Sequence, residues 1–263
     1  MTLILGILCD DGVVMASDSA ATLGFSGQYT IGQQEVQKIR NLSDRILYSS
    51  TGGVGMAQLL TERISRLWRD KILATGTPEA CMDKIGKAIS EVVTPYMTTA
   101  QIVRQLTGDV GPSLCKSLVA FPVQNAPVLC QFEYNGVPER ATSDLPFVAL
   151  GSGQSIADPF LAFLRRVLWT SSKPTVAEGK LAAVWTIDHV RRTNAGGVGG
   201  AIQLATLQPG TKECVVKMLG QDDVEEHLQR IDAAERAFAA ELRGATKAAQ
   251  PSTPPIPDVP AAH

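Results

Sequence analysis

The first fifty residues carry the hydrophobic pattern of β-strands. Apolar residues fill 2–9 and 12–17, and the Asp11-Gly12 pair between these runs favours a tight hairpin turn. A looser, glycine-containing segment follows at 19–37. A second antiparallel pair is predicted at 38–42 and 44–49, around a short turn.

Apolar residues at helical spacing then predict four helices in two blocks. The first block covers about 55–73 and about 78–105. Pro78 stands where the second of these helices would begin, and Pro95 is a candidate position for a kink or a break in it. The second block covers about 154–169 and about 175–193.

Strand patterns separate the helical blocks and close the folded part. They lie at 117–121, 128–134, 147–150, 201–207 and 213–218, with turns at Asn135-Gly136 and Pro209-Gly210. Blocks of strands and blocks of helices, without strict alternation, argue for an α+β fold. Two such blocks can stack sheet on sheet with the helices outside. We therefore predict a four-layer αββα sandwich that forms one domain over residues 1–219.

The pattern changes after Gly220. Apolar residues at spacings of four, three, seven and four predict an amphipathic helix over 220–244, with its seam at Val224, Leu228, Ile231, Phe238 and Leu242. The sequence leaves open whether this helix packs on its own domain or docks on a neighbouring subunit. Over 245–263, Ala, Pro, Ser and Thr dominate and no apolar face can form, so we expect a disordered tail.

Composition excludes several classes of function. Of 263 residues, 44% are hydrophobic and 19% are charged, and the net charge of -2 argues against a nucleic-acid partner. No apolar run approaches the roughly 20 residues that a membrane-spanning helix needs, and no secretory signal pattern is present, so we expect a cytoplasmic protein. The five scattered cysteines form no C-x-x-C pair, and only three histidines accompany them. We expect buried, reduced thiols and neither a metal nor a cofactor.

Candidate chemistry begins at Thr2, directly after Met1. If the small second residue lets Met1 be trimmed, Thr2 presents a hydroxyl and a free amine, which together form a nucleophile and its base. The unperturbed pKa of an α-amine is about 7.7 to 8.0, so part of it is unprotonated near neutral pH. Met-Thr starts are also common among proteins without this chemistry. Other residues must therefore support the interpretation.

Further polar residues fall at predicted strand ends and turns. Asp18 ends the second strand, Lys38 begins the third, Gly52-Gly53 ends the fourth, and Gly151-Ser152-Gly153 lies at a strand-to-helix turn. Loops and strand ends are where side chains and backbone groups converge on functional sites.

In these residues the chain resembles the β subunits of the proteasome and their bacterial relatives, which are N-terminal-nucleophile hydrolases. The resemblance runs from Thr2 to about Leu207, is strongest in the first sixty residues, and is closest to bacterial homologues built from a single subunit type. By position it implies a nucleophile at Thr2, its acidic partner Asp18 sixteen residues later, a catalytic lysine at Lys38, an oxyanion-hole N–H at Gly52, a proton-relaying serine at Ser152, a substrate-backbone contact at Thr22, and a side-chain pocket flanked by Ser50 and Val54.

Each implied role has a physical reason. An ammonium beside the Thr2 hydroxyl stabilises its alkoxide, and an opposite charge at Asp18 keeps Lys38 in place and ionised. Glycine at 52 lets the backbone approach a tetrahedral intermediate, and losing one such donor typically costs about 10²- to 10³-fold in rate.

The resemblance implies a threonine endopeptidase whose copies form stacked rings around a chamber, as a hexameric or heptameric homo-oligomer, in a double ring, that takes unfolded polypeptide or peptide. The sequence identifies no unfolding ATPase partner. It departs from the family at 191–200, where the usual acidic residue and serine are missing and Asp188 lies too early, and at Ala20, which replaces an arginine. A structural or weakly active ring subunit and a small-molecule amidase therefore remain alternatives.

Overall fold

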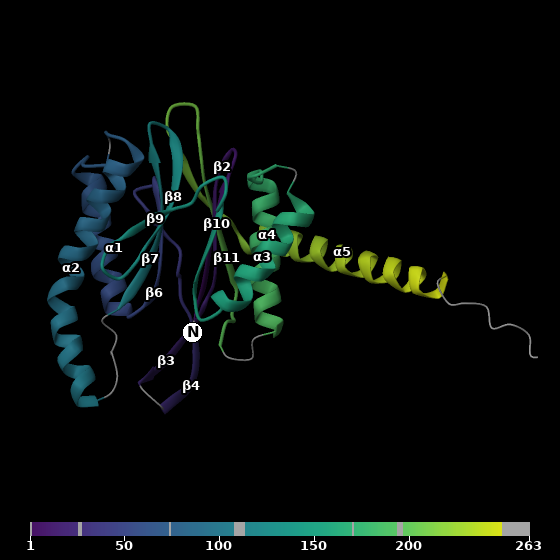
Figure 1. The fold of residues 1–263 in the computed structure, drawn as a ribbon, viewed down its shortest axis with the longest axis horizontal. Coiled ribbons are helices and arrows are strands. Elements are labelled where there is room, and N and C mark those ends of the chain that lie inside the picture. Colours follow the sequence, from purple (N-terminus) through teal and green to yellow (C-terminus); the bar gives the residue numbers. More distant parts are fainter. Residues whose placement is uncertain are drawn as a thin grey trace, which may run out of the picture.

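The computed structural model describes residues 2–25, 28–73, 75–107, 114–169, 171–193 and 197–248, and the side chains of 22–25, 28–33 and 244–248 lie outside that description. Two antiparallel sheets stack face to face, and a pair of helices covers each outer face (Figure 1). The predicted αββα sandwich is confirmed.

The first sheet carries the N-terminus. Its strand order is β10-β1-β2-β11-β12, with bounds Phe147–Gly151, Leu3–Cys9, Gly12–Asp18, Ile202–Gln208 and Val215–Met218. Every residue of β2 is buried, because one face of the sheet meets the second sheet and the other meets helices. This two-sided burial explains why the first strands read as continuous apolar runs.

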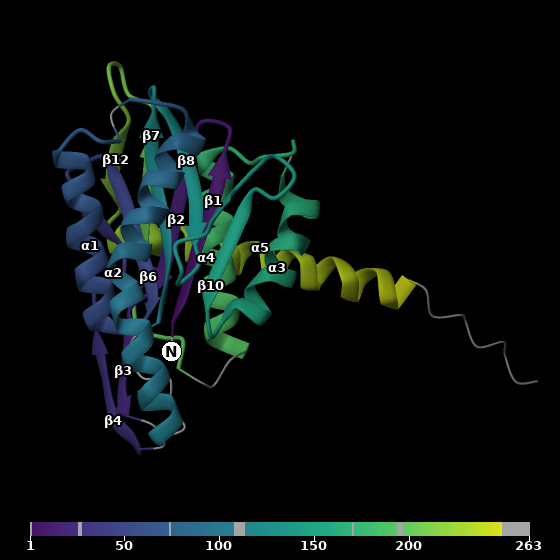
Figure 2. The ribbon, with the colours of Figure 1, turned by 60° about the vertical axis from the view of Figure 1, so that its left-hand side comes forward.

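The second sheet has the order β5-β6-β7-β8-β9, with bounds Arg40–Leu42, Ile46–Gly52, Cys115–Val123, Ala126–Phe132 and Pro138–Arg140. Helices α1 (Val54–Arg69) and α2 (Pro78–Thr107) cover its outer face. Helices α3 (Gln154–Leu168) and α4 (Val176–Thr193) cover the outer face of the first sheet, as Figure 2 also shows. Between the sheets, a third apolar core includes Ile4, Met15 and Leu118.

The structure corrects three local predictions. The segment 19–37 is not loose but contains a separate hairpin of β3 (Ala20–Phe25) and β4 (Gln28–Glu35). Lys38 does not begin a strand, since β5 starts at Arg40. Helix α2 runs unbroken through Pro95. Proline removes one helical donor, and Glu91, whose carbonyl loses that donor, lies on the exposed side of the helix.

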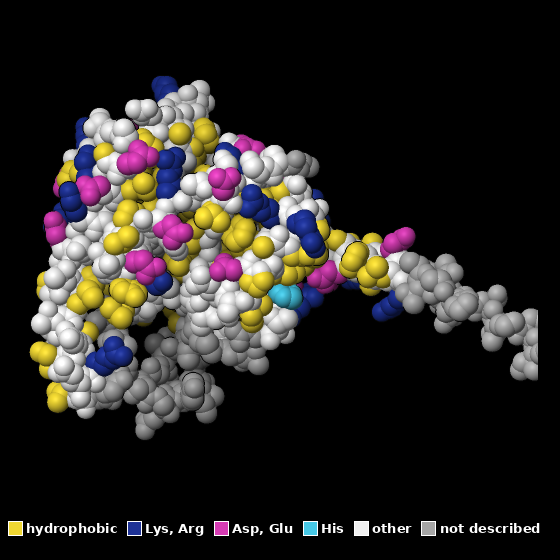
Figure 3. All heavy atoms as spheres, in the orientation of Figure 1, with side chains coloured by type: hydrophobic (Ala, Val, Ile, Leu, Met, Phe, Trp, Pro, Cys, Tyr) yellow, Lys and Arg dark blue, Asp and Glu magenta, His cyan; other side chains and the backbone are white. Residues whose placement is uncertain are grey.

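Helix α5 (Gln221–Ala248) continues four residues beyond its predicted end. Its first half packs on its own domain: Val224 and Ile231 are buried, and Glu235 accepts a hydrogen bond of 2.8 Å from the indole of Trp185. Its second half projects from the body, and apolar side chains lie exposed there (Figure 3), Phe238 at 65%. Packing on its own domain is therefore confirmed for the first half alone. Within the described ranges, none of the helices combines the length and apolarity of a membrane span.

Candidate active site

Thr2 immediately precedes β1, at the end of the sandwich where the N-terminus is marked in Figures 1 and 2. Because β10 flanks β1 on one side, the turn after β10 lies beside Thr2. The Thr2 nitrogen donates to Ser152 Oγ at 3.2 Å, and Gly153 N donates to the Thr2 carbonyl at 3.5 Å. Gly151 has φ 102°, and a Cβ there would lie 2.1 Å from that carbonyl oxygen. Only glycine fits this approach.

Asp18 and Lys38 form a buried ion pair on the other side of β1. The Lys38 Nζ donates to Asp18 Oδ1 at 2.6 Å, and the side chains are 7% and 0% exposed. The same oxygen accepts the backbone N–H of Leu3 at 2.9 Å. One carboxylate oxygen therefore links the ammonium to the residue that follows Thr2.

Burial and the carboxylate act on Lys38 in opposite directions. Burial lowers the pKa of the Lys38 ammonium below 10.5, and the hydrogen bond and the charge of Asp18 raise it, without cancelling the shift. The other Asp18 oxygen, Oδ2, accepts Gly199 N at 3.2 Å, so both oxygens of this buried carboxylate have donors. The result is a cation whose position is fixed and whose proton is held less tightly than that of a surface lysine.

Gly52 ends β6, opposite Cys115 of β7. Gly52 has φ 127°, and a Cβ added there would lie 2.0 Å from the Leu114 carbonyl oxygen. A residue with a side chain therefore cannot replace it without strain. Gly53 N donates to that same carbonyl at 3.1 Å, after which α1 begins at Val54. The side chain of Ser49 on the same strand donates to the Lys38 carbonyl at 2.9 Å, so this end of β6 lies at the end of the sandwich that carries Lys38 and Thr2.

The predicted substrate contacts are placed less completely. Ser50 is half-buried on β6, opposite Ser117 of β7. Val54, the first residue of α1, is 63% exposed. The side chain of Thr22 lies outside the described residues. All three assignments stay predictions.

A comparison with known families fits this geometry. The family described as "Proteasome subunit" matches residues 2–193, which is well over half of the chain. The chain belongs to the proteasome subunit family. Among curated relatives of this family member, "Proteasome subunit beta" of Methanococcus maripaludis (strain C5) is 27% identical over 234 residues, which cover 88% of this chain and 92% of the relative. "Proteasome subunit beta" of Methanocaldococcus vulcanius is 26% identical over 232 residues, 84% of this chain and 90% of the relative.

Solved structures of Anbu share the fold of this proteasome-family chain. "Anbu (Gly-1) mutant from Hyphomicrobium sp. strain MC1" superposes with a TM-score of 0.66 at 17% identity, over 92% of this chain and all of that one. Anbu "(ancestral beta-subunit)" from Yersinia bercovieri superposes with a TM-score of 0.64 at 17% identity, over 90% of this chain and 96% of that one. "Helical Assembly of the Anbu Complex from Pseudomonas aeruginosa" superposes with a TM-score of 0.63 at 19% identity, over 96% of this chain and 98% of that one.

The late glycine stretch of this proteasome-family chain holds Asp18 through its backbone. Gly199 N donates to Asp18, and the Gly199 carbonyl accepts Ser19 N at 3.2 Å. Gly200 has φ 74°, and a Cβ there would lie 2.3 Å from the Ser19 hydroxyl. Asp188 instead forms an ion pair with Arg192 at 2.7 Å, on α4. The missing acid is visible in the sequence, but the hydrogen bond from the Gly199 N–H to the Asp18 carboxylate is not.

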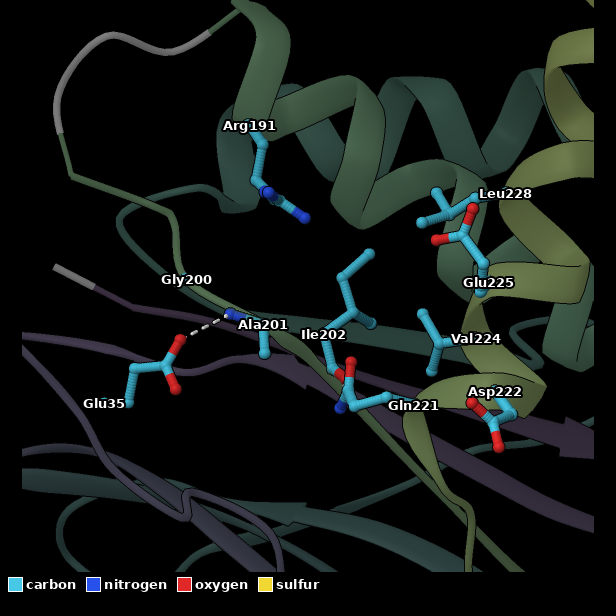
Figure 4. Close-up of a pocket in the computed structure, with 10 residues that line it drawn as sticks. All are labelled: Glu35, Arg191, Gly200, Ala201, Ile202, Gln221, Asp222, Val224, Glu225 and Leu228. Atoms are coloured by element: carbon cyan, nitrogen blue, oxygen red, sulfur yellow. Dashed lines mark hydrogen bonds between the residues drawn. The ribbon is translucent and has the colours of Figure 1, made fainter.

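A hollow of about 420 Å³ lies on the far side of this stretch, between β11, the end of α4 and the start of α5 (Figure 4). Glu35 of β4 lines it and accepts Ala201 N at 3.3 Å. Arg191 points into the same space from α4. The hollow thus adjoins the glycines that hold Asp18.

Gln203 of β11 is the second residue that sequence reasoning missed. Its Oε1 accepts the backbone N–H groups of Lys38 at 2.8 Å and Ile39 at 3.2 Å. A glutamine within a predicted strand is ordinarily interpreted as a residue that faces solvent. Nothing in the local sequence indicates that Gln203 binds the backbone of Lys38.

The cysteines take no part in the site. All five are buried, which confirms the burial that the sequence predicts for them. Burial raises the pKa of Cys115 to about 11 and that of Cys130 to about 12, so neither thiol forms a useful thiolate near neutral pH.

Proposed function

We propose that the chain is a threonine-type peptidase subunit that uses Thr2 as nucleophile after removal of Met1. The observation that supports this best is the sharing of Asp18 Oδ1 between Lys38 Nζ and Leu3 N. Burying an ion pair brings little stability by itself, so the buried Lys38 ammonium is better explained by a role in chemistry than by a role in folding. A cation held one residue from a potential nucleophile can have such a role.

In the proposed reaction, the freed Thr2 amine takes the proton of the Thr2 hydroxyl while the hydroxyl oxygen attacks a peptide carbonyl carbon. The carbonyl oxygen becomes an oxyanion, which the Gly52 N–H stabilises. Collapse breaks the C–N bond, and the protonated amine passes its proton to the leaving nitrogen. Water, deprotonated by the same amine, then hydrolyses the ester on Thr2 and restores the hydroxyl.

Lys38 and Ser152 support these steps in the proposal. The Lys38 ammonium lowers the energy of the alkoxide that forms on Thr2, and Asp18 prevents its reorientation. Ser152 Oγ already lies 3.2 Å from the nitrogen that becomes the amine, which is within reach for holding a proton or a water there. Ser50, Val54 and Thr22 remain the proposed contacts for substrate.

We further propose assembly from many copies of this chain, in the cytoplasm, around a space that admits unfolded polypeptide. The resemblance to the family implies a closed double ring of six- or sevenfold symmetry. The Anbu structure from Pseudomonas aeruginosa is titled a helical assembly. The same head-to-tail contact gives a ring if its rotation closes and a helix if it does not, so both results retain the proposed interface.

Hydrolysis of fluorogenic peptides by wild type and Thr2→Ala tests the activity. Thr61→Ala is a matched control, because within the described residues the Thr61 hydroxyl donates to its own helix, at Ala57 O. We expect turnover in wild type and Thr61→Ala, and none in Thr2→Ala. Equal turnover in Thr2→Ala would refute the nucleophile.

Electron micrographs of the same samples test the assembly. Rings or helical arrays with no turnover of any peptide would favour the structural subunit, which the displaced Asp188 supports. A small oligomer that cleaves only small amides would favour the amidase.

A further inference from the structure

Lys38 belongs to a short connection, residues 36–39, between hairpin strand β4 and β5. Backbone groups outside a ladder need other partners when they are buried, and side chains supply them here. Ser49 Oγ donates to the Lys38 carbonyl at 2.9 Å. Other backbone groups of the connection, on Val36, Lys38 and Ile39, bond to residues in or next to the first sheet, on the opposite side of the sandwich.

Gln203 supplies most of these contacts. Its Oε1 accepts Lys38 N and Ile39 N, and its Nε2 donates to the Val36 carbonyl at 2.6 Å. Ser17 Oγ also donates to Oε1, at 3.4 Å. A single amide group therefore holds the backbone on both sides of residue 37, using its acceptor and its donor at once.

The register places Gln203 beside the carboxylate that pairs with Lys38. On β11 and β2, Ile202 pairs with Asp18 and Gln203 pairs with Ser17. Asp18 and Gln203 therefore lie at adjacent paired positions of one sheet and bind the same lysine. Asp18 binds the Lys38 side chain, and the Gln203 amide, which we call the amide clamp, binds the backbone around Lys38. Two further contacts tie the connection to this sheet: Glu35 accepts Ala201 N (Figure 4), and Val36 N donates to the Ser19 carbonyl at 2.9 Å.

We propose that Gln203 is a positioning residue that sets Lys38 against Asp18 and, through that pair, tunes the Thr2 nucleophile. This inference rests on the proposed function. Gln203 acts on the backbone of Lys38 and takes no part in bond making. An error of about 1 Å in the placement of a catalytic group can cost on the order of 10²-fold in rate.

The amide is required because the clamp needs an acceptor and a donor together. Leucine at 203 would supply neither. Glutamate would keep an acceptor for Lys38 N and Ile39 N but lose the donor to the Val36 carbonyl, and it has nearly the same shape. Gln203→Glu is therefore the milder variant, and it keeps the test usable if Gln203→Leu folds poorly. Gln221→Leu is the matched control, since Gln221 bonds the backbone of the same strand at Ile202 O, 3.1 Å, without contacting the 36–39 connection.

The experiment measures kcat and KM on one fluorogenic peptide, and the rate of Thr2 acylation by a β-lactone, for the full-length assembled protein. We expect Gln203→Leu to lower kcat and the acylation rate by about 10²-fold with little change in KM, Gln203→Glu to lower them less, and Gln221→Leu to leave them unchanged.

The double variant Lys38→Ala, Gln203→Leu separates positioning from a general structural effect. In a Lys38→Ala background, Gln203→Leu should cause no further loss, because the group it positions is gone. An equal further loss in that background, or wild-type rates in both Gln203 variants, would overturn the inference while leaving the peptidase proposal standing. A wild type that neither cleaves peptide nor reacts at Thr2 would refute the proposed function instead, and this inference with it.

Discussion

Removing one charge of the Asp18–Lys38 pair should destabilise the protein more than removing both. At 2.6 Å and an effective dielectric constant near 20, the attraction between the two charges is about 6 kcal/mol. Desolvation of both groups offsets most of this. Asp18→Asn would leave the Lys38 ammonium buried without a counter-charge, and such changes typically cost about 3 to 5 kcal/mol.

In the double variant Asp18→Asn, Lys38→Met, no uncompensated charge remains. Replacing a buried pair by well-packed hydrophobic residues is often neutral or stabilising, but asparagine can accept only one of the two backbone N–H groups that Asp18 binds. We therefore expect the double variant to be about 1 to 3 kcal/mol less stable than wild type and clearly more stable than Asp18→Asn. Urea unfolding of wild type, Asp18→Asn, Lys38→Met and the double variant, at one pH and one protein concentration, measures this. A double variant less stable than Asp18→Asn would refute the reasoning.

The same four proteins separate stability from catalysis. The Lys38 charge is needed for the proposed alkoxide stabilisation, so the double variant should recover stability without recovering acylation of Thr2. Recovery of both would show that the pair serves only the fold.

Three further predictions concern the frame of the site and helix α5. Gly151→Ala should cost about 1 to 3 kcal/mol and slow acylation of Thr2, because its φ of 102° is strained for alanine and the new Cβ would meet the Thr2 carbonyl; urea unfolding and β-lactone kinetics measure the two effects. Burial lowers the pKa of His227 below 6.5, so below that pH the unfolded chain binds more protons than the folded protein. The free energy of unfolding should therefore fall as the pH drops from 7.5 to 5, and it should fall less in His227→Gln. Urea unfolding at each pH measures this. Ile231 is 1% exposed, so Ile231→Ala should lower the free energy of unfolding by about 2 to 5 kcal/mol. Phe238 is 65% exposed, so Phe238→Ala should change it by no more than about 0.5 kcal/mol. Equal effects of the two changes in thermal unfolding would contradict the anchoring of α5 through its first half.

The layered fold was predictable because its signals are local. Continuous apolar runs in β1 and β2 and helical stripes in α1 to α4 each reflect one kind of burial, and their order suggests a sandwich. The β3–β4 hairpin was not predictable in this way. Among the described strands, β3 and β4 pair with each other and with neither five-stranded sheet, so their place in the fold depends on the hairpin pairing and not on a position within a main sheet.

The chemistry of the site was predictable only where residue type is distinctive. Thr2, Asp18, Lys38 and the Gly151-Ser152-Gly153 turn carry groups or conformations that few other residues offer, and the structure brings them to one end of the sandwich. Gln203 acts by reaching across from another sheet to a backbone 165 positions away in sequence. Such a contact depends on how two sheets stack, which no local pattern records.

The central claim is that Thr2 becomes an N-terminal nucleophile, and peptide mapping by mass spectrometry after treatment with an epoxyketone or a β-lactone tests it most directly. We predict an N-terminal peptide that begins at Thr2 and carries the inhibitor, and no such adduct in Thr2→Ala. An N-terminal peptide that retains Met1 and carries no inhibitor would contradict the account.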